Sequence, residues 1–184
     1  MSAAADEHRR VAGAFTVTVE GVAPDAWDNP SPVDGWVARD VVGHLVEWFP
    51  AFLDGAAGIT LPAGASVADD PAGAWRTQTD AVQALLDDPE TAEREHDFPH
   101  MGRMPLEQVV DMIYTGDVFL HRWDLARATG QDETLDAEKC AVMFEGMLPM
   151  DEMLRQSGQY GPRVAVADDA DVQTQLLAFI GRAP

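Results

Sequence analysis

The chain has 184 residues, enough for one domain with a small appendage but short for two full domains. Hydrophobic residues make up 46% of it and charged residues 24%, a composition that predicts a folded core and excludes general disorder. The 12 basic and 32 acidic residues give a formal net charge of −20. Such a charge repels nucleic-acid phosphates and anionic lipid head groups, so nucleic acid and membrane surfaces are excluded as expected partners.

The N-terminal sequence bears on the cellular compartment, and the cysteine content bears on the possible metal chemistry. Charged residues occupy positions 6–10, where a secretory signal would have its apolar core. No apolar run approaches the roughly 18 residues that span a bilayer. We therefore expect a soluble, cytoplasmic protein. Cys140 is the single cysteine, which excludes an internal disulfide and a multi-thiolate metal site within one chain, so that any metal must be held by His and carboxylate side chains.

Apolar residues at spacings of three and four predict helices in the first half of the chain. The first covers about 11–22, and a Pro-rich ordered loop follows it at 24–36. A second amphipathic helix covers 37–58, and 59–70 has the composition of a linker. A third helix begins at Pro71, whose ring suits a first helical position, and ends before Pro89.

The second half of the chain continues the helical pattern after a loop at 93–105. The longest periodic stretch runs from 105 to about 129 and is closed by Gly130. Further helices are predicted at 136–148 and, after a Pro, to 158, with a short extended piece at 163–166 before a last helix. The expected fold is all-α: a four-helix bundle with extra C-terminal helices and at most a short extended segment. We expect a single domain over 1–184, with a C-terminal appendage at about 159–184.

The helix at 105–129 changes character halfway along its inward face. The residues of this face follow one another at spacings of three and four: Leu106, Val110, Ile113, Asp117, His121 and Asp124. Burying an unpaired carboxylate costs several kcal/mol, so the ionisable half of this face needs a cation, a metal ion or a hydrogen-bond network. Asp117 and His121 lie one turn apart and can both approach a single atom.

A further ligand is available on the second helix, where His44 lies at the flank of the apolar face. Together His44, Asp117 and His121 form a set of two imidazoles and one carboxylate. This set suits Zn²⁺, with Ni²⁺ or Fe²⁺ as alternatives, and it leaves coordination positions open for a ligand. Asp124, one turn beyond His121, can accept the ring hydrogen of a ligating imidazole or interact with a nearby Arg.

Each of these residues also has a purely structural interpretation. Asp117 and His121 could form a buried ion pair that fixes helix packing, and His44 could be an ordinary histidine at a helix flank. His96 and His100 fall in the predicted loop. We expect them to be solvated there; the alternatives are that they line the mouth of a pocket or replace one of the three ligands. Cys140 is interpreted as a small buried residue rather than a nucleophile.

Two segments resemble a known family. PSPVDGWVARDVVGHLVEW, residues 30–48, is similar to the entry loop and second helix of the DinB-like bundle proteins related to mycothiol-dependent maleylpyruvate isomerase. DVFLHRWDLARATG, residues 117–130, resembles the second ligand segment of that family. The C-terminal residues 164–184 resemble an actinobacterial branch of the group. The resemblance therefore touches both expected ligand helices and the tail.

The resemblance implies a DinB-like fold and carries over a set of metal ligands. By position they are His44, Asp117 and His121, the residues that the helix spacing had already selected. It also implies that the protein uses a low-molecular-weight thiol, namely mycothiol or a similar compound. The isomerase pattern has Glu where this chain has the shorter Asp117, which puts metal preference and occupancy in question. The tail is shorter than the isomerase's separate C-terminal domain, so isomerase activity does not follow.

The primary functional hypothesis is a metal- and thiol-dependent S-transferase or isomerase that acts on a small electrophile. A divalent ion would lower the pKa of the thiol, because the thiolate is the nucleophilic form. A thiol pocket is expected near Trp48, Arg103 and the loop at 96–104. The alternatives are a noncatalytic metal-binding or sensing protein and a mononuclear iron oxygenase. The Met and Trp content is also compatible with a homodimer.

Overall fold

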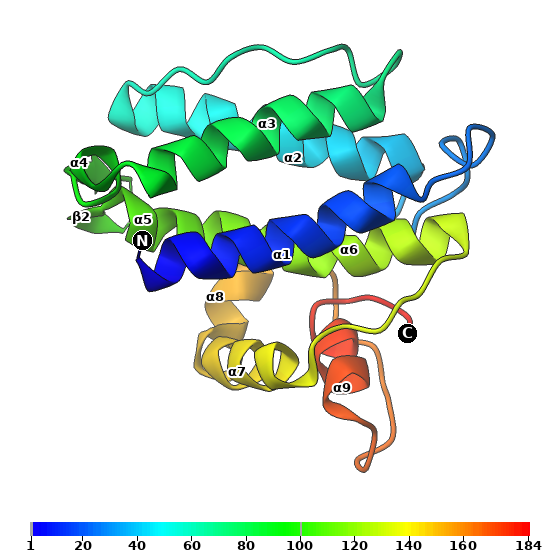
Figure 1. The fold of residues 1–184 in the computed structure, drawn as a ribbon. Coiled ribbons are helices and arrows are strands. Elements are labelled where there is room, and N and C mark those ends of the chain that lie inside the picture. The colour runs from blue at the N-terminus through cyan, green and yellow to red at the C-terminus, as the bar shows by residue number, and fades with distance from the viewer. Residues whose placement is uncertain (1, 100) are drawn as a thin grey trace. The chain divides into compact units, whose positions relative to one another are not determined.

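The computed structural model describes residues 2–99 and 101–184 and is predominantly helical (Figure 1). The predicted all-α class is therefore confirmed. The contacts divide the chain into two compact units, of which the first ends at Asp132 and the second is Glu133–Pro184. The description of 1–184 as a single domain with an appendage from about residue 159 stays a prediction. Among the described residues, no helix combines the length and apolar character that crossing a membrane requires.

The first unit is built around four long helices that lie side by side (Figure 1). α1 and α6 run in one direction, and α2 and α3 run in the opposite direction. The segment 58–70 crosses the length of the bundle between α2 and α3, which is why these consecutive helices are parallel. The bounds of the helices are α1 (Ala3–Glu20), α2 (Ala38–Ala57), α3 (Pro71–Asp87) and α6 (Gly116–Thr129).

Local sequence signals fix the ends of these helices. Asp40 Oδ2 accepts a hydrogen bond from the Val37 backbone N–H at 2.9 Å at the start of α2. Asp70 accepts from the Gly73 N–H at 2.8 Å at the start of α3. Gly130 ends α6 in a left-handed conformation with φ +68°, which a side chain would disfavour. Both helices that carry the predicted metal ligands thus have a defined terminus.

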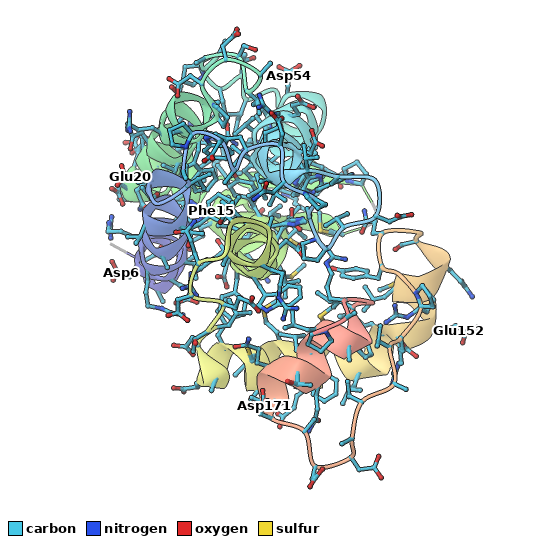
Figure 2. All side chains as sticks on the ribbon, turned by 90° about the vertical axis from the view of Figure 1, so that its right-hand side faces the viewer. Asp6, Phe15, Glu20, Asp54, Glu152 and Asp171 are labelled. Carbon is cyan, nitrogen blue, oxygen red and sulfur yellow. The ribbon has the colours of Figure 1, made fainter. Side chains whose placement is uncertain are left out.

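The core of the first unit is aromatic as well as aliphatic. Phe15 turns from α1 into the interior and packs edge-on against Trp75 of α3, at a ring-centroid distance of 4.6 Å (Figure 2). Trp75 Nε1 donates to Thr16 Oγ1 at 2.8 Å, which satisfies the buried indole. Phe49 of α2 stacks on Tyr114 at 4.0 Å. These contacts fix α2 and α3 against the helices beside them.

The segment 93–105, predicted to be a loop, contains a short hairpin. After α4 (Pro89–Ala92), strands β1 (Glu95–Phe98) and β2 (Gly102–Pro105) pair antiparallel, with His96 opposite Met104. Phe98 is buried and stacks on Phe52 of α2 at 5.7 Å. The loop prediction was wrong here because the strands are only four residues long, too short for a clear alternating pattern.

The predicted helix at 105–129 is interrupted by a wider turn. It consists of α5 (Leu106–Val109), a π-helical turn (Val110–Thr115) and α6. A π-turn inserts residues relative to an α-helix, so the side chains after it are rotated about the helix axis. As a result Ile113, expected on the inward face, is only half-buried, whereas Tyr114 and Thr115 are fully buried.

The second unit contains short helices. They are α7 (Ala137–Met147), a 3-10 turn (Leu148–Met150), α8 (Asp151–Gln156) and α9 (Val172–Phe179). Phe144 of α7 packs edge-on against Phe179 of α9 at 5.7 Å. Residues 163–166, predicted to be extended, have no regular secondary structure, although the Val164 N–H donates to the Ala178 carbonyl at 2.9 Å. Cys140 is buried, as expected, and burial raises its pKa to about 11.

Candidate metal centre

The three predicted ligands lie together between α2 and α6. His44 comes from α2, and Asp117 and His121 come from successive turns of α6. One nitrogen or oxygen atom from each side chain lies within 4.8 Å of the others. The His121 side chain is 7% exposed, whereas Asp117 and His44 are 25% and 31% exposed. The cluster is therefore rooted in the core and open to solvent on one side.

Two separations between donor atoms are close to those found around one small dication. His44 Nε2 lies 3.1 Å from Asp117 Oδ2, and His121 Nε2 lies 3.4 Å from Asp117 Oδ1. In a tetrahedral zinc site with bonds of about 2.0–2.2 Å, donor atoms are separated by roughly 3.4 Å. The imidazole and carboxylate chemistry is also that of Zn²⁺, Ni²⁺ and Fe²⁺ sites. The residues thus fit the metal that the sequence suggested, and their assignment as ligands is a proposal.

His121 is oriented by a second carboxylate. Its Nδ1 lies 2.9 Å from Oδ2 of Asp124, which is 1% exposed. Both ring nitrogens therefore face carboxylates. Burial would lower the pKa of His121, but the negative charges of Asp117 and Asp124 and their hydrogen bonds outweigh it and raise the pKa to about 9. Near neutral pH the metal-free imidazole carries protons on both nitrogens, and the proton on Nδ1 directs Nε2 towards Asp117.

Asp117 is held as a carboxylate by three donors. Burial raises its pKa, but the charge and hydrogen bonds of His121 and His44 lower it further than burial raises it, so the net pKa lies well below the ordinary value. Trp48 Nε1 also donates to Asp117 Oδ2, at 2.9 Å. The carboxylate is ionised over the whole physiological pH range, as a metal ligand must be.

Two tryptophans flank the imidazoles. The Trp36 ring stacks on His121 at a centroid distance of 5.8 Å and lies 5.1 Å from the His44 ring. Trp48, one turn beyond His44, lies 6.0 Å from it on the same helix. These large side chains restrict the rotamers of both imidazoles.

The π-turn that precedes Asp117 is tied to the first helix. His8 of α1 is fully buried, and its Nδ1 lies 2.9 Å from Thr115 Oγ1, the last residue of the turn. Its ring stacks on Tyr114 at 5.8 Å. Among the described residues, His8 Nε2 has no hydrogen-bond partner. Burial, followed by the charge of Arg9, lowers the pKa of His8 to about 4, so the ring is neutral at pH 7.

Replacing Asp124 by Asn tests its orienting role. The substitution keeps the size of the side chain and removes its charge, so His121 becomes a less basic and less well oriented ligand. We expect metal affinity to fall by roughly 10- to 100-fold, the usual cost of losing such a partner. Competition with a chromophoric chelator measures this, and D169N, at an exposed carboxylate of the second unit, is the charge-matched control. Equal affinity in D124N and wild type would show that Asp124 has no such role.

Two of the remaining sequence candidates, His96 and Arg103, are on the hairpin. His96 is on β1, so its assignment to a loop was wrong; the residue is half-buried, and its Nε2 has no hydrogen-bond partner among the described residues. His100 lies outside the described residues. Arg103, expected near a thiol pocket, donates from Nε to Glu95 Oε2 across the hairpin at 2.7 Å.

Sequence reasoning missed the contacts that surround the ligands. The Trp48 bond to Asp117 had a signal, because Trp48 is one turn from His44 and faces the same way. The stacking of Trp36 on His121 joins residues 85 positions apart in the sequence and had no local signal. The His8 bond to Thr115 depends on the π-turn, which simple periodicity does not reveal.

The fold and this cluster define a helical bundle with a candidate centre of two histidines and one aspartate. Comparison with known families gives the same class, because the family described as the mycothiol maleylpyruvate isomerase N-terminal domain matches residues 8–126. The match covers more than half of the chain and includes His44, Asp117 and His121. The chain therefore belongs to this family.

Two curated relatives extend the similarity to nearly the whole chain. They are the uncharacterised proteins MT0763 and Rv0738 of Mycobacterium tuberculosis, from strains CDC 1551 / Oshkosh and H37Rv. Each is 29% identical over 192 residues, which covers 95% of this chain and 95% of the relative. No solved structure matches the chain.

Proposed function

We propose that the protein binds one divalent metal ion through His44, Asp117 and His121 and uses it with a low-molecular-weight thiol to transform a small electrophile. The reaction class is S-transfer or thiol-assisted isomerisation. The observation that carries the proposal is the convergence of the three donors, from two helices, at a site that remains open on one side. Membership of a mycothiol-related family supports mycothiol or a similar compound as the thiol.

A buried ion pair explains these features less well than a metal site. A structural pair would need only Asp117 and His121, yet His44 Nε2 also approaches the same carboxylate from another helix. Asp124 supplies the carboxylate behind the imidazole that is common at metal centres. The partial exposure of His44 and Asp117 also gives a route by which an ion and a ligand could enter.

When bound, a divalent ion supplies Lewis acidity, which lowers the pKa of a thiol and so makes the nucleophilic thiolate available near neutral pH. The protein's own groups prepare the site for that chemistry. Asp124 keeps a proton on Nδ1 of His121 and leaves Nε2 directed at the site. Trp48 holds the Asp117 carboxylate by its indole N–H, and the Trp36 ring packs against both imidazoles.

The proposal is tested by thiol alkylation. Metal-free protein and protein loaded with Zn²⁺, Ni²⁺ or Fe²⁺ are incubated with mycothiol, cysteine or glutathione and with monobromobimane, which becomes fluorescent when sulfur displaces its bromide. We expect catalysed turnover with a metal-loaded protein and one of the thiols, its loss on chelation and its loss in H121A. The natural electrophile need not be known, because the alkylation reports thiol activation.

The outcomes separate the proposal from its alternatives. Metal binding without acceleration for any thiol would contradict a thiol-dependent enzyme and favour a noncatalytic binding or sensing protein. Oxygen consumption that requires Fe²⁺ and is abolished by chelation would favour the iron oxygenase instead. Turnover that persists fully in H121A would show that the proposed metal centre takes no part in the reaction.

A further inference from the structure

A cleft of about 440 Å³ adjoins the candidate metal centre. Its wall is formed by one face of α2 and by Trp36, two residues before that helix, with two aliphatic residues of the 58–70 crossover on the other side. The residues of the α2 side are Trp36, Arg39, Asp40, Gly43, His44 and Glu47. His44 belongs both to this wall and to the proposed ligand set. The cleft therefore leads directly to the position where the proposed reaction would take place.

The charges that the cleft offers to a ligand are negative. Arg39 is the one cation among the lining residues, and its guanidinium is already engaged. Its Nε and Nη2 lie 2.9 Å and 2.8 Å from Asp28 Oδ1, and its Nη1 donates to the Ala68 carbonyl at 2.8 Å. An anionic ligand would have to displace Asp28 to bind it. In the metal-free protein, the Arg39 guanidinium of the cleft wall is thus not available to a carboxylate or phosphate.

The two carboxylates of the wall are more available. Glu47 is exposed and makes no hydrogen bond or ion pair with the described residues. Asp40 uses Oδ2 to accept the Val37 N–H and keeps its second oxygen. Asp40, His44 and Glu47 follow one another at spacings of four and three on α2, so they lie along one face of the helix. The Trp36 ring also lines the cleft, with its centroid 5.1 Å from that of the His44 ring, and tryptophan is the aromatic side chain that attracts cations most strongly.

We propose that this cleft binds a cationic group, a protonated or quaternary amine, on the electrophilic substrate. The inference rests on the proposed function for the position of the reacting atom, but the cation site itself does not require a metal. Asp40 and Glu47 each lie about one helical turn, or about 5.4 Å, from His44 along α2. An amine held by these carboxylates would therefore lie on the order of four or five bonds from the atom that reacts beside His44.

The test is a binding measurement with a matched series of small probes. Butyltrimethylammonium, butyrate and butanol have similar apolar tails and differ in charge. Each is titrated into metal-free and zinc-loaded protein by calorimetry, and the indole N–H signals are followed by nuclear magnetic resonance. In the metal-free protein, where no zinc ion can bind the butyrate carboxylate, we expect the ammonium to bind roughly tenfold more tightly than butyrate, to weaken at high salt and to shift the Trp36 signal more than that of buried Trp75.

Variants distinguish the cleft from the general charge of the protein. E47Q is expected to weaken ammonium binding by roughly threefold to tenfold, in line with the loss of one nearby charge. E145Q removes an exposed carboxylate from α7 and is expected to bind as wild type does. G43A should also weaken binding while the protein stays folded, because its added Cβ would lie 3.7 Å from Val67 Cγ1, an ordinary contact inside the cleft.

The result that would overturn the inference is equally specific. In the metal-free protein, butyrate binding as tightly as the ammonium, or equal losses of ammonium binding in E47Q and E145Q, would show that the cleft does not select cations. Because the probes are tested on metal-free protein as well, ammonium binding without any thiol turnover would support this site and contradict the proposed enzyme activity. Thiol turnover without selective ammonium binding would support the enzyme and reject the cation site.

Discussion

Replacing Asp117 by Ala is expected to abolish metal binding near neutral pH. Asp117 is the one carboxylate of the proposed ligand set, and its two oxygens face both imidazoles. Without it, two histidines remain, and we expect affinity for Zn²⁺ to fall by more than about 100-fold, beyond the cost of losing an orienting partner such as Asp124. The measurement is a competition titration against a chromophoric chelator. D80A, at an exposed carboxylate of α3, is the matched control.

The same titration has an expected pH dependence. In the metal-free protein, Asp117 and Asp124 hold the pKa of His121 at about 9, so a proton on Nε2 must leave before that atom can bind a metal. Below this pKa, affinity should rise by about tenfold per pH unit through this one proton. Metal affinity that stays the same from pH 6 to 8, or equal affinity in D117A and D80A, would contradict the ligand assignment.

The metal-free protein is expected to lose stability between pH 6.5 and 4 because of His8. Its pKa is about 4 in the folded state and 6.5 in the unfolded state, so within this window the unfolded chain binds the proton more readily. The contribution is fully present above pH 6.5 and is lost as the pH falls towards the folded pKa. The loss of unfolding free energy should total about 2–3 kcal/mol by pH 4.5.

Urea unfolding of wild type and H8N at several pH values between 7 and 4.5 measures this effect. Asn can keep a hydrogen bond to Thr115 Oγ1 but does not titrate. H8N is expected to be less stable at pH 7, because the buried ring is lost, yet to show a shallower decline on acidification. Acidification changes the net charge of both proteins in nearly the same way, so the difference between their unfolding free energies reports the titration of His8. Parallel declines in the two proteins would show that His8 does not titrate as its burial implies.

The helices were predictable because each buries one continuous face. Val41, Leu45 and Phe49 follow one another at spacings of four along α2, and all are fully buried. Asp117 and His121 were conspicuous because they continue an apolar face with ionisable groups. Helical spacing alone brings this pair together, and the structure places His44 beside them from α2.

The parts that the sequence did not predict depend on partners outside the local pattern. The hairpin at 95–105 is held by strand pairing and by the packing of Phe98 on Phe52, a residue of α2. The π-turn is anchored by the bond between Thr115 and His8, more than 100 positions earlier. The acidic wall of the cleft depends on which charge is already paired, and Arg39 would have been counted as an available cation without its contact to Asp28.

The central claim is that His44, Asp117 and His121 share one divalent ion. The most direct measurement is anomalous diffraction at the zinc absorption edge from crystals of protein loaded with one equivalent of Zn²⁺. We expect a single strong peak within bonding distance, about 2.0–2.2 Å, of both imidazole Nε2 atoms and an Asp117 oxygen. A zinc peak elsewhere on the protein, with these three side chains still hydrogen-bonded to one another, would contradict the claim.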